Sequence, residues 1–307
     1  SSYLKASQNG QILYSIADEG VVAFRVLSNG SLARLNSANI RGMRGCHLST
    51  SKADDYIFIS GFHDGKITVL NLNKDGAVGQ IADGVFHKGL GSVAERSFRP
   101  HVSCSRLTPD ERFLMVADLG IDQIKVYRFD HKDGKITLVD TIRCELESAP
   151  KYFMFSSDGR FFYVLYELKN MIEVYSYKEG ERVPIVEKIQ TIPSTGSKPN
   201  QLTAACAMHL SPDEKHLFCS NAGDNTVSMY DRDDETGMLT MRFCLPISGD
   251  YPKDIAIFPD GKHLASINHE GSISFFKIDY EKGLLVMSDR SIKVNEPNCC
   301  EIVKIGD

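Results

Sequence analysis

The sequence predicts an all-β protein, a seven-bladed β-propeller built from four-stranded antiparallel blades. A short turn motif recurs about every fifty residues, and we refer to it as the turn phrase. Its copies are centred on Asp110, Asp158, Asp213 and Asp260. Less regular copies of the turn phrase occur at residues 7–13 and 51–57. Short apolar runs rich in β-forming residues follow the copies, and they are too short for helices. A strand-based repeat of this length is typical of propeller blades.

The turn phrase predicts a hairpin between the first two strands of each blade. In three copies a proline (Pro109, Pro212 or Pro259) presets φ, and in all four the aspartate that follows caps its own turn. In the fourth repeat, the apolar run at 161–165 predicts a buried second strand, and 172–175 predicts a third. Polar turns such as 236–238 then lead to a fourth strand. Four strands repeated radially leave few exposed sheet edges.

Six full repeats are expected to start near residues 2, 46, 103, 151, 206 and 253, and one extra strand is expected at 296–305. Propellers commonly close by pairing one terminus with strands from the other end, so the extra strand predicts a seventh blade. We expect that blade to be incomplete, because its N-terminal strands are absent from this chain. A repeat that runs end to end also predicts one domain over 1–307. A six-bladed ring clasped by 296–305 is the alternative.

The composition narrows the classes of molecule that this protein is expected to bind and the compartment in which it is expected to work. The net charge is −5 and no basic stripe is visible, which argues against nucleic acid and against an acidic membrane surface. Eight cysteines occur without a CxxC spacing, and several fall in predicted strands, where a reduced thiol packs as a small apolar group. These features favour a reducing cytoplasm. No signal peptide or transmembrane run is visible in the sequence.

Two positions in each repeat are expected at the end of the first hairpin that lies away from its turn. In the fourth repeat they are Lys151 and Glu167, equally distant from the hairpin midpoint at Gly159, so we expect them to lie opposite each other. The first strand of a blade lines the central channel, so the equivalent residues should surround one mouth of the ring. The first positions are Ser2, Cys46, Ser103, Lys151, Cys206, Lys253 and Asn298, and the second are Asp18, Phe62, Leu119, Glu167, Ala222 and His269.

The strong polar members of this predicted ring are Lys151, Lys253, Glu167 and His269. A carboxylate beside a lysine can act as a general base towards water while the cation stabilises a developing oxyanion. A cross-strand salt bridge that only stabilises the hairpin explains the same pair. The sequence leaves both interpretations of Lys151 and Glu167 open.

One segment is distinctive beyond the repeat. Residues 87–101 contain His87, Arg96 and His101 together with two glycines, and Asp118-Leu119-Gly120-Ile121-Asp122 follows. This segment resembles the seven-bladed lactonase family, which contains propeller-type 6-phosphogluconolactonases and, more distantly, carboxymuconate lactonizing enzymes. Further matches at Tyr166-Glu167-Leu168 and Asp250-Tyr251-Pro252 extend the resemblance over about 2–303.

The resemblance implies a hydrolase of a phosphorylated sugar lactone such as 6-phosphogluconolactone. Neither a cofactor nor a metal is expected, because a strained ester carbonyl is already electrophilic. The partner would be a small anionic sugar acid or lactone, bound by a monomer or weak dimer. The implied catalytic residues are Glu167, Lys151 and His101, and the implied substrate-binding residues are Lys253, Arg96, Arg99, His87, Ser103, Tyr152 and His269.

The sequence departs from the family pattern at several of these positions. Ser103 and Tyr152 stand where the family carries histidines, and Ala222 stands where it carries an arginine. Lys151 and Lys253 replace arginines, which keeps a cation but loses the bidentate fork. Two alternatives to hydrolysis therefore stay open. One is a catalytically degenerate propeller that binds a small anionic metabolite or a protein partner, and the other is a lactonizing lyase acting on a dicarboxylate.

Several polar residues in this region also have structural explanations. His87 and Arg96 could anchor their loop to a neighbouring blade, and His101 could be a hydrogen-bonded rim residue. Asp118 and Asp122 are spaced like a metal-binding pair, but an ion needs several further oxygen ligands. We therefore expect these two aspartates to form turns.

Overall fold

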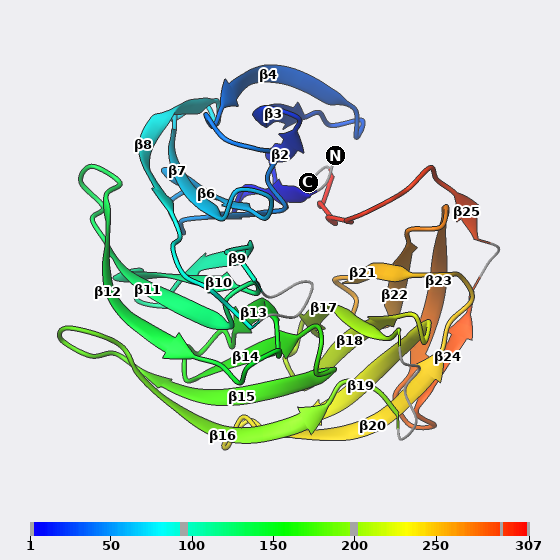
Figure 1. Cartoon of the computed structure of the whole chain (residues 1–307). Coiled ribbons are helices and arrows are strands. Elements are labelled where there is room, and N and C mark those ends of the chain that lie inside the picture. Colours follow the sequence, from blue (N-terminus) through cyan, green and yellow to red (C-terminus); the bar gives the residue numbers. More distant parts are fainter. Residues whose placement is uncertain (1–2, 93–97, 197–201, 289–290, 306–307) are drawn as a thin grey trace. The chain divides into compact units, whose positions relative to one another are not determined.

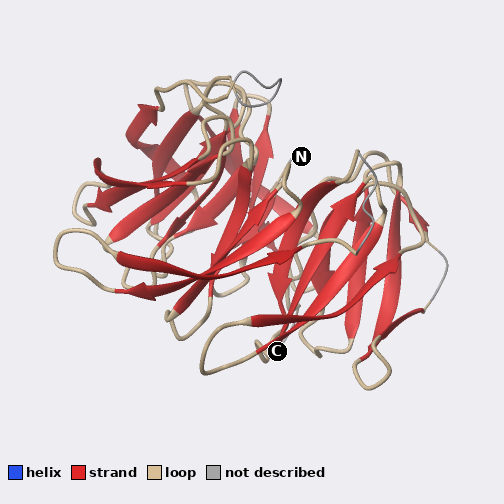
Figure 2. Cartoon of the chain, turned by 60° about the horizontal axis from the view of Figure 1, so that its bottom comes forward, coloured by secondary structure: helices blue, strands red, loops and turns tan. Residues whose placement is uncertain are grey.

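The computed structural model describes residues 3–92, 98–196, 202–288 and 291–305. Every helix or strand in these ranges is a β-strand, as Figure 2 shows. The described strands form six antiparallel sheets of four consecutive strands, the last with one additional strand. The prediction of an all-β propeller with four-stranded antiparallel blades is confirmed. A total of seven blades, one of them incomplete, stays a prediction.

The chain divides into two compact units. The first contains Ser1–Pro150, Glu179–Pro184 and Glu301–Asp307, and the second contains Lys151–Lys178 and Ile185–Cys300. Each unit holds three of the described blades. The expectation of a single domain over 1–307 stays a prediction.

The first unit contains the first three blades (Figure 1). The first blade is β1 (Leu4–Ala6), β2 (Ile12–Ala17), β3 (Gly20–Val26) and β4 (Leu32–Asn39). The second is β5 (His47–Thr50), β6 (Tyr56–Gly61), β7 (Lys66–Leu72) and β8 (Val78–Phe86). The third is β9 (Val102–Leu107), β10 (Phe113–Asp118), β11 (Gln123–Phe129) and β12 (Ile136–Arg143).

The second unit contains the other three blades. The fourth blade is β13 (Pro150–Phe155), β14 (Phe161–Tyr166), β15 (Met171–Lys178) and β16 (Ile185–Pro193). The fifth is β17 (Ala204–Leu210), β18 (His216–Ala222), β19 (Thr226–Arg232) and β20 (Leu239–Pro246). The sixth is β21 (Pro252–Ile257), β22 (His263–Asn268), β23 (Ser272–Asp279) and β24 (Leu284–Met287), with β25 (Ile292–Lys293) also pairing with β23.

The repeated turn phrase forms the expected hairpin turns. In the fourth blade, Asp158 Oδ1 accepts hydrogen bonds from Ser156 Oγ at 2.6 Å and from the Arg160 amide at 3.0 Å. Between them, Gly159 has a φ of 71°, a conformation that glycine adopts without steric cost. The same aspartate-to-amide contact recurs at Asp110, Asp213 and Asp260. The phrase is therefore a side-chain-capped turn that sets the start of each second strand.

The hydrophobic core lies between adjacent blades. Consecutive side chains of a strand point to opposite faces, and Ile57 and Phe58 of β6 accordingly belong to different clusters. In the second unit, Tyr163 packs against Met208 in one interface, and Phe218 lies with Ile255 in the next. The second strands are covered on both faces, so β6, β10 and β14 are buried along their whole length. This explains why the sequence shows continuous apolar runs there.

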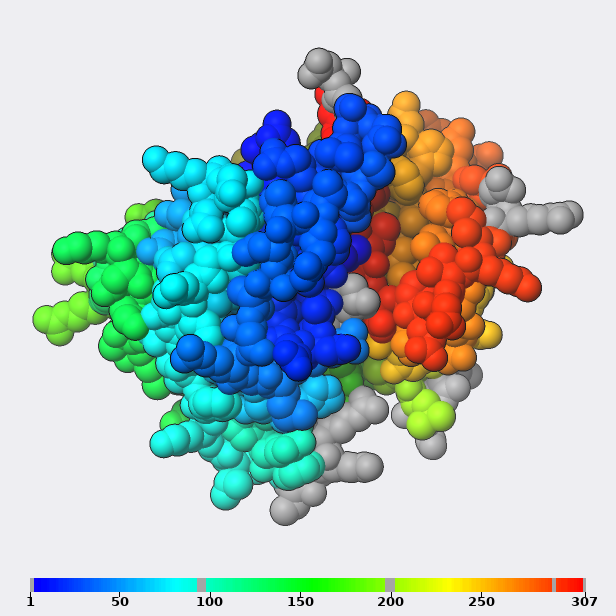
Figure 3. Space-filling view, turned by 90° about the horizontal axis from the view of Figure 1, so that it is seen from above, coloured from blue at the N-terminus to red at the C-terminus, as the bar shows by residue number. Residues whose placement is uncertain are grey.

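The outer strands of the blades are much more exposed. Exposed and partly buried residues alternate along most of β4, as expected for a strand with one face in solvent. The residues of the first blade, blue in Figure 3, contribute to the face shown there. Among the residues that the structure describes, none belongs to a helix of the length and apolarity needed to span a membrane.

The strand predicted at 296–305 is wrong, because the described part of this segment is coil. A strand needs a neighbouring backbone to pair with, and single side chains hold this segment instead. In the second unit, the Cys300 amide donates to Asp254 Oδ2 at 3.0 Å. In the first unit, Glu301 Oε1 accepts from the Ala6 amide at 3.0 Å.

Candidate functional site

Polar side chains fix the chain just before the first strand of a blade. Asp122 Oδ1 accepts from the Ala149 amide at 2.8 Å, just before β13, and Asn225 Oδ1 accepts from the Tyr251 amide at 2.9 Å, just before β21. Ala149 and Tyr251 have φ values of 56° and 60°, which residues other than glycine rarely adopt. These contacts place the residues that follow, Lys151 and Lys253.

Asp118 and Asp122, the two aspartates that are spaced like a metal-binding pair, accept hydrogen bonds from backbone amides. Besides the Ala149 amide, Asp122 accepts from the Glu147 amide at 2.8 Å, and Asp118 accepts from the amides of His101 and Gly120. No group of three or more metal-binding side chains occurs among the residues described here. The contacts agree with the expectation that both aspartates form turns.

The first position of the predicted ring is a β-bulge in three blades. In β9 the register passes from Val102 to Cys104, in β17 from Ala205 to Ala207, and in β21 from Pro252 to Asp254. The skipped residues are Ser103, Cys206 and Lys253.

The bulges correct the sequence-based register for these three blades. The two ring positions of a blade do not lie directly opposite each other there, because the bulge inserts one unpaired residue. A bulge bends its strand and re-aims the side chain. Its recurrence at the same position indicates that the first strands present these side chains in an equivalent way.

Lys151 and Glu167 meet, as the sequence predicts. Lys151 Nζ lies 2.7 Å from Glu167 Oε2, and the two side chains are 27% and 10% exposed. Lys151 Nζ also lies 3.7 Å from Cys206 Sγ of the next blade. The three residues therefore form a partly buried cluster of a cation, a carboxylate and a thiol within the second unit.

Lys253 lies near this cluster but makes a different contact. Its Nζ donates a 2.7 Å hydrogen bond to Asn298 Oδ1, which is a neutral acceptor. Its charge interacts with those of Lys151, Glu167 and Cys206. The residue is half-buried, so the two lysines share one poorly solvated region.

The two lysines have opposite electrostatic environments. Burial lowers the pKa of Lys151, but the charges of the Cys206 thiolate form and of Glu167, with the Glu167 hydrogen bond and the nearby Tyr251, raise it overall above its usual value. Burial and then the positive charge of Lys151 lower the pKa of Lys253, and Cys206 and Glu167 only partly offset them. Lys151 is therefore the firmly protonated lysine, and Lys253 loses its proton more readily.

Two residues with aromatic rings, Tyr251 and His269, lie near Lys253. Tyr251 precedes Lys253 by two residues, and His269 directly follows β22, the strand paired with β21. The ring centroids of Tyr251 and His269 are 6.1 Å apart, and the His269 amide donates to the Tyr251 carbonyl oxygen at 2.9 Å. His269 Nδ1 is buried without a hydrogen-bond partner. Sequence reasoning did not select Tyr251 as a site residue, although its place just before Pro252 and Lys253 was a usable signal.

His101 belongs to the first unit and has a defined tautomer. Its Nδ1 lies 2.7 Å from the carbonyl oxygen of Phe62, and the two rings stack with centroids 4.4 Å apart. A carbonyl oxygen only accepts, so Nδ1 carries the hydrogen and Nε2 is the basic nitrogen of the neutral ring. This orientation suits a general base, although the residue is only 6% exposed.

Substrate binding by His87 stays a prediction, and the His87 side chain is completely buried in this structure. His87 Nδ1 lies 2.7 Å from Asp118 Oδ2, and His87 Nε2 has no hydrogen-bond partner. Burial lowers the pKa of His87 despite the opposing hydrogen bond and charge of Asp118. The residue joins the end of β8 to the end of β10, as the structural alternative proposed.

The remaining predicted binding residues are distributed over both units. The Ser103 hydroxyl is buried and donates to the carbonyl oxygen of Pro150 at 3.0 Å. Tyr152 packs against the apolar cluster between the fourth and fifth blades. Arg99 is exposed and lies over the Phe98 ring, and Arg96 lies outside the described residues. Substrate contacts by these four residues stay predictions.

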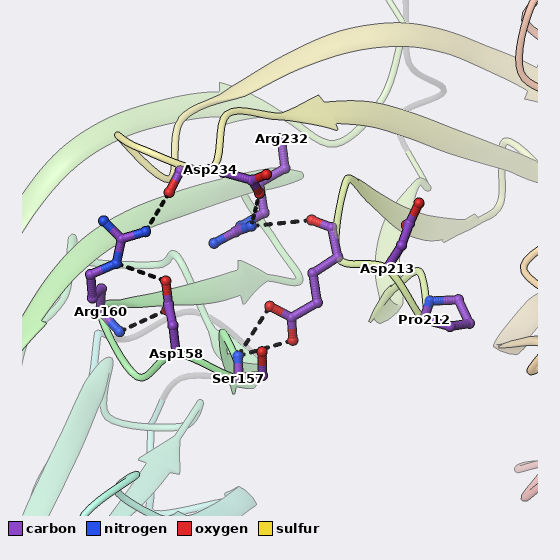
Figure 4. Close-up of a pocket in the computed structure, with 8 residues that line it drawn as sticks. Ser157, Asp158, Arg160, Pro212, Asp213, Arg232 and Asp234 are labelled. Atoms are coloured by element: carbon purple, nitrogen blue, oxygen red, sulfur yellow. Dashed lines mark hydrogen bonds and ion pairs between the residues drawn. The ribbon is translucent and has the colours of Figure 1, made fainter.

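A charged cavity lies at the turn end of the fourth and fifth blades, away from Lys151. It has a volume of about 310 Å³ and includes Ser157, Arg160, Glu214 and Arg232 in its lining. Figure 4 shows Arg160 paired with Asp158 of the same hairpin turn. The charged groups pair with one another, so this cavity has the character of a structural junction.

Comparison with known proteins agrees with the fold. Residues 1–302 match the family described as lactonase, 7-bladed β-propeller. A 6-phosphogluconolactonase of Bacillus subtilis is 26% identical over 98% of this chain and 87% of its own length. A 6-phosphogluconolactonase of Formosa agariphila is also 26% identical, over 96% of this chain and 86% of its own length.

Comparison with solved structures also agrees with the fold. A Bacteroides fragilis protein is 30% identical, with a TM-score of 0.87 over 97% of this chain and 85% of its own. The periplasmic gluconolactonase of Pseudomonas aeruginosa is 22% identical, with a TM-score of 0.91 over 99% of this chain and 88% of its own. The second likeness supports the fold alone.

Proposed function

Because this chain belongs to the seven-bladed β-propeller lactonase family, we propose that it hydrolyses a sugar lactone, with a phosphorylated lactone such as 6-phosphogluconolactone as the substrate. The observation that carries the proposal is the 2.7 Å contact between Lys151 and Glu167, with Lys253 nearby. A base and two cations are the groups that opening an anionic lactone requires.

The proposed reaction needs only proton transfer and charge stabilisation. Glu167 takes a proton from water as the water oxygen bonds to the lactone carbonyl carbon. Lys151 stabilises the oxyanion that forms, since its ammonium group remains protonated beside Glu167. Collapse of this intermediate breaks the ring C–O bond, and the departing alkoxide takes up the proton held by Glu167. The product is the open sugar acid.

The other predicted residues have supporting roles in this proposal. Lys253, in its protonated form, binds the phosphate or carboxylate end of the substrate as a point charge. His101 and Arg99 belong to the first unit, and their participation in the same site stays a prediction. A cytoplasmic location and a monomeric or weakly dimeric state are likewise proposals, the first supported by eight cysteines that occur without a CxxC spacing.

The test follows the lifetime of freshly prepared 6-phosphogluconolactone. The protein is expected to shorten this lifetime beyond spontaneous opening, and Glu167→Gln is expected to abolish the effect. Glu187→Gln is the matched control, because Glu187 is an exposed residue of β16. If the wild-type protein and Glu167→Gln give the same decay, the hydrolase proposal fails.

A binding function is the second candidate. Ser103 and Tyr152 replace histidines expected in the family, and Ser103 is used in a contact with Pro150. A ligand that binds only the folded state raises the melting temperature. Stabilisation by 6-phosphogluconate without lactone turnover would favour a binding protein. Turnover of a dicarboxylate with formation of a lactone would favour a lactonizing lyase instead.

A further inference from the structure

The amine of Lys253 has an unusual environment for a lysine. It is half-buried, and it donates a hydrogen bond to the neutral side-chain oxygen of Asn298. Among the described residues, no carboxylate lies within ion-pair distance of Lys253 Nζ. A buried ammonium without a counter-ion is poorly stabilised, so the environment favours the neutral amine.

The neighbouring groups add to this effect. Lys151 is paired with Glu167 at 2.7 Å and keeps its positive charge. That charge lies close enough to Lys253 to disfavour a second ammonium. Cys206 and Glu167 oppose the effect without cancelling it, and the pKa of Lys253 is lowered overall. A lysine desolvated beside another cation is a recognised type of activated nucleophile.

We infer that Lys253 is a carbonyl-reactive residue, which forms a reversible imine with small aldehydes or 2-oxo acids that carry a carboxylate. Its bulge position in β21 separates its side chain from the regular cross-strand pairs. The protonated Lys151 supplies a cation for the carboxylate of the carbonyl compound. The lone pair of the neutral Lys253 amine supplies the electrons for the new bond.

The reaction balances without a cofactor or an oxidant. The amine nitrogen bonds to the carbonyl carbon and loses its two hydrogens as protons, and the carbonyl oxygen takes up two protons and departs as water. A C=N bond replaces the C=O bond, and hydrolysis reverses the step. This activity does not depend on lactone hydrolysis, since it uses the neutral form of Lys253, whereas lactone binding uses the protonated form.

The test uses glyoxylate, a small aldehyde with a carboxylate, together with cyanoborohydride, which reduces an imine to a stable amine. Peptide mapping at neutral pH then gives the labelling rate of each lysine. The neutral fraction of an amine rises about tenfold for each unit by which its pKa is lowered. Because the pKa of Lys253 is lowered, Lys253 is expected to react several-fold faster than the exposed Lys262.

Two variants separate this result from general lysine reactivity. Lys253→Arg should remove the fast label and leave Lys262 unchanged. Lys151→Arg keeps the neighbouring charge and should retain the fast label. The double variant Lys151→Met/Glu167→Gln removes the charge without leaving Glu167 ionised and unpaired, and it should slow labelling of Lys253 toward the rate of Lys262.

Equal labelling rates for Lys253 and Lys262 in the wild-type protein would overturn the inference. Fast labelling that persists in the double variant would overturn the role of Lys151. Lactone decay is measured on the same preparations. Selective labelling without lactone turnover would support the carbonyl reactivity and reject only the proposed hydrolysis.

Discussion

The carboxylate of Glu214 accepts hydrogen bonds from the backbone amide of Ser157 at 2.9 and 3.1 Å. The contact joins the first hairpin turn of the fifth blade to that of the fourth. Equivalent contacts join Glu111 to the Lys52 amide and Asp54 to the Gln8 amide. In all three, the acidic residue has a φ between 51° and 55°. A strained backbone position is therefore used to carry a carboxylate that links neighbouring blades.

The sixth blade shows the alternative arrangement. Pro212 has no amide hydrogen to donate, and the residue that faces it in the next turn is Gly261, with a φ of 65°. A Cβ on Gly261 would lie 3.9 Å from Pro212 Cδ. Because Pro212 offers no amide donor, an acidic side chain at the facing position would have no such contact to make. Glycine, which adopts this φ without strain, occupies that position instead.

This relationship predicts different effects of two substitutions at Glu214. Glu214→Ala loses the contact with Ser157 but keeps a side chain at positive φ, so we expect it to lower the free energy of unfolding by about 1 kcal/mol. Glu214→Gly also loses the contact but relieves the backbone, which is worth about 1 kcal/mol. Chemical denaturation should find the glycine variant more stable than the alanine variant. The opposite order would contradict the strained-backbone explanation.

The sequence was sufficient to predict the blades because each turn is encoded locally. The aspartate, the preceding hydroxyl residue and the following left-handed position all lie within a few residues, as at Asp158. The segment 296–305 shows the limit of this reasoning. Its apolar alternation suits a strand, but strand formation depends on a backbone partner that a local pattern cannot reveal.

The site was predictable only in part, for a related reason. Counting from the turn brought Lys151 and Glu167 together, because both strands of a hairpin have a fixed rise per residue. The count could not reveal the bulges at Cys206 and Lys253. It also could not show that His87 points into the protein, since burial depends on packing between strands distant in sequence.

The Lys151–Glu167 pair should show energetic coupling. Removing one partner leaves the other charge poorly solvated, so we expect Lys151→Met and Glu167→Gln each to cost roughly 2 kcal/mol of stability. The double variant should cost less than the sum of the two by about 1 kcal/mol. Denaturant unfolding of all four proteins completes the cycle. Strict additivity would show that the 2.7 Å contact makes no net contribution.

His87 should make the protein sensitive to acid. Because burial lowers the pKa of His87, the unfolded chain binds a proton that the folded chain does not. Stability associated with His87 is therefore lost as the pH falls below the unfolded value of about 6.5. His87→Asn, which keeps an amide donor near Asp118, should reduce the fall in melting temperature between neutral pH and pH 5. His131→Asn is the exposed control, and an equal reduction there would exclude His87 as the source.

Lys253 should lower the stability of the protein at neutral pH. Its pKa is lowered in the folded state, so below the unfolded value of about 10.4 the unfolded chain holds the proton more strongly. The cost is about 1.4 kcal/mol for each unit of lowering. Lys253→Met keeps much of the side-chain volume and removes this cost, although it loses the hydrogen bond to Asn298, which is worth about 1 kcal/mol. We expect removal of the charge to outweigh loss of the hydrogen bond at pH 7 and to give a net gain in the free energy of unfolding.

The pH dependence distinguishes this cause from improved packing. The gain from Lys253→Met should shrink as the pH rises toward 10, because the unfolded chain then also begins to lose the lysine proton and the difference in proton binding between the two states becomes smaller. Lys262→Met, at an exposed turn position, should change stability by less than about 0.5 kcal/mol at either pH. A gain that is constant from pH 7 to pH 10 would indicate packing, and a loss at pH 7 would show that Lys253 is well stabilised as an ammonium. A stability gain in Lys253→Met, together with selective glyoxylate labelling of Lys253 in the wild-type protein, would place Lys253 among residues kept at a cost to the fold.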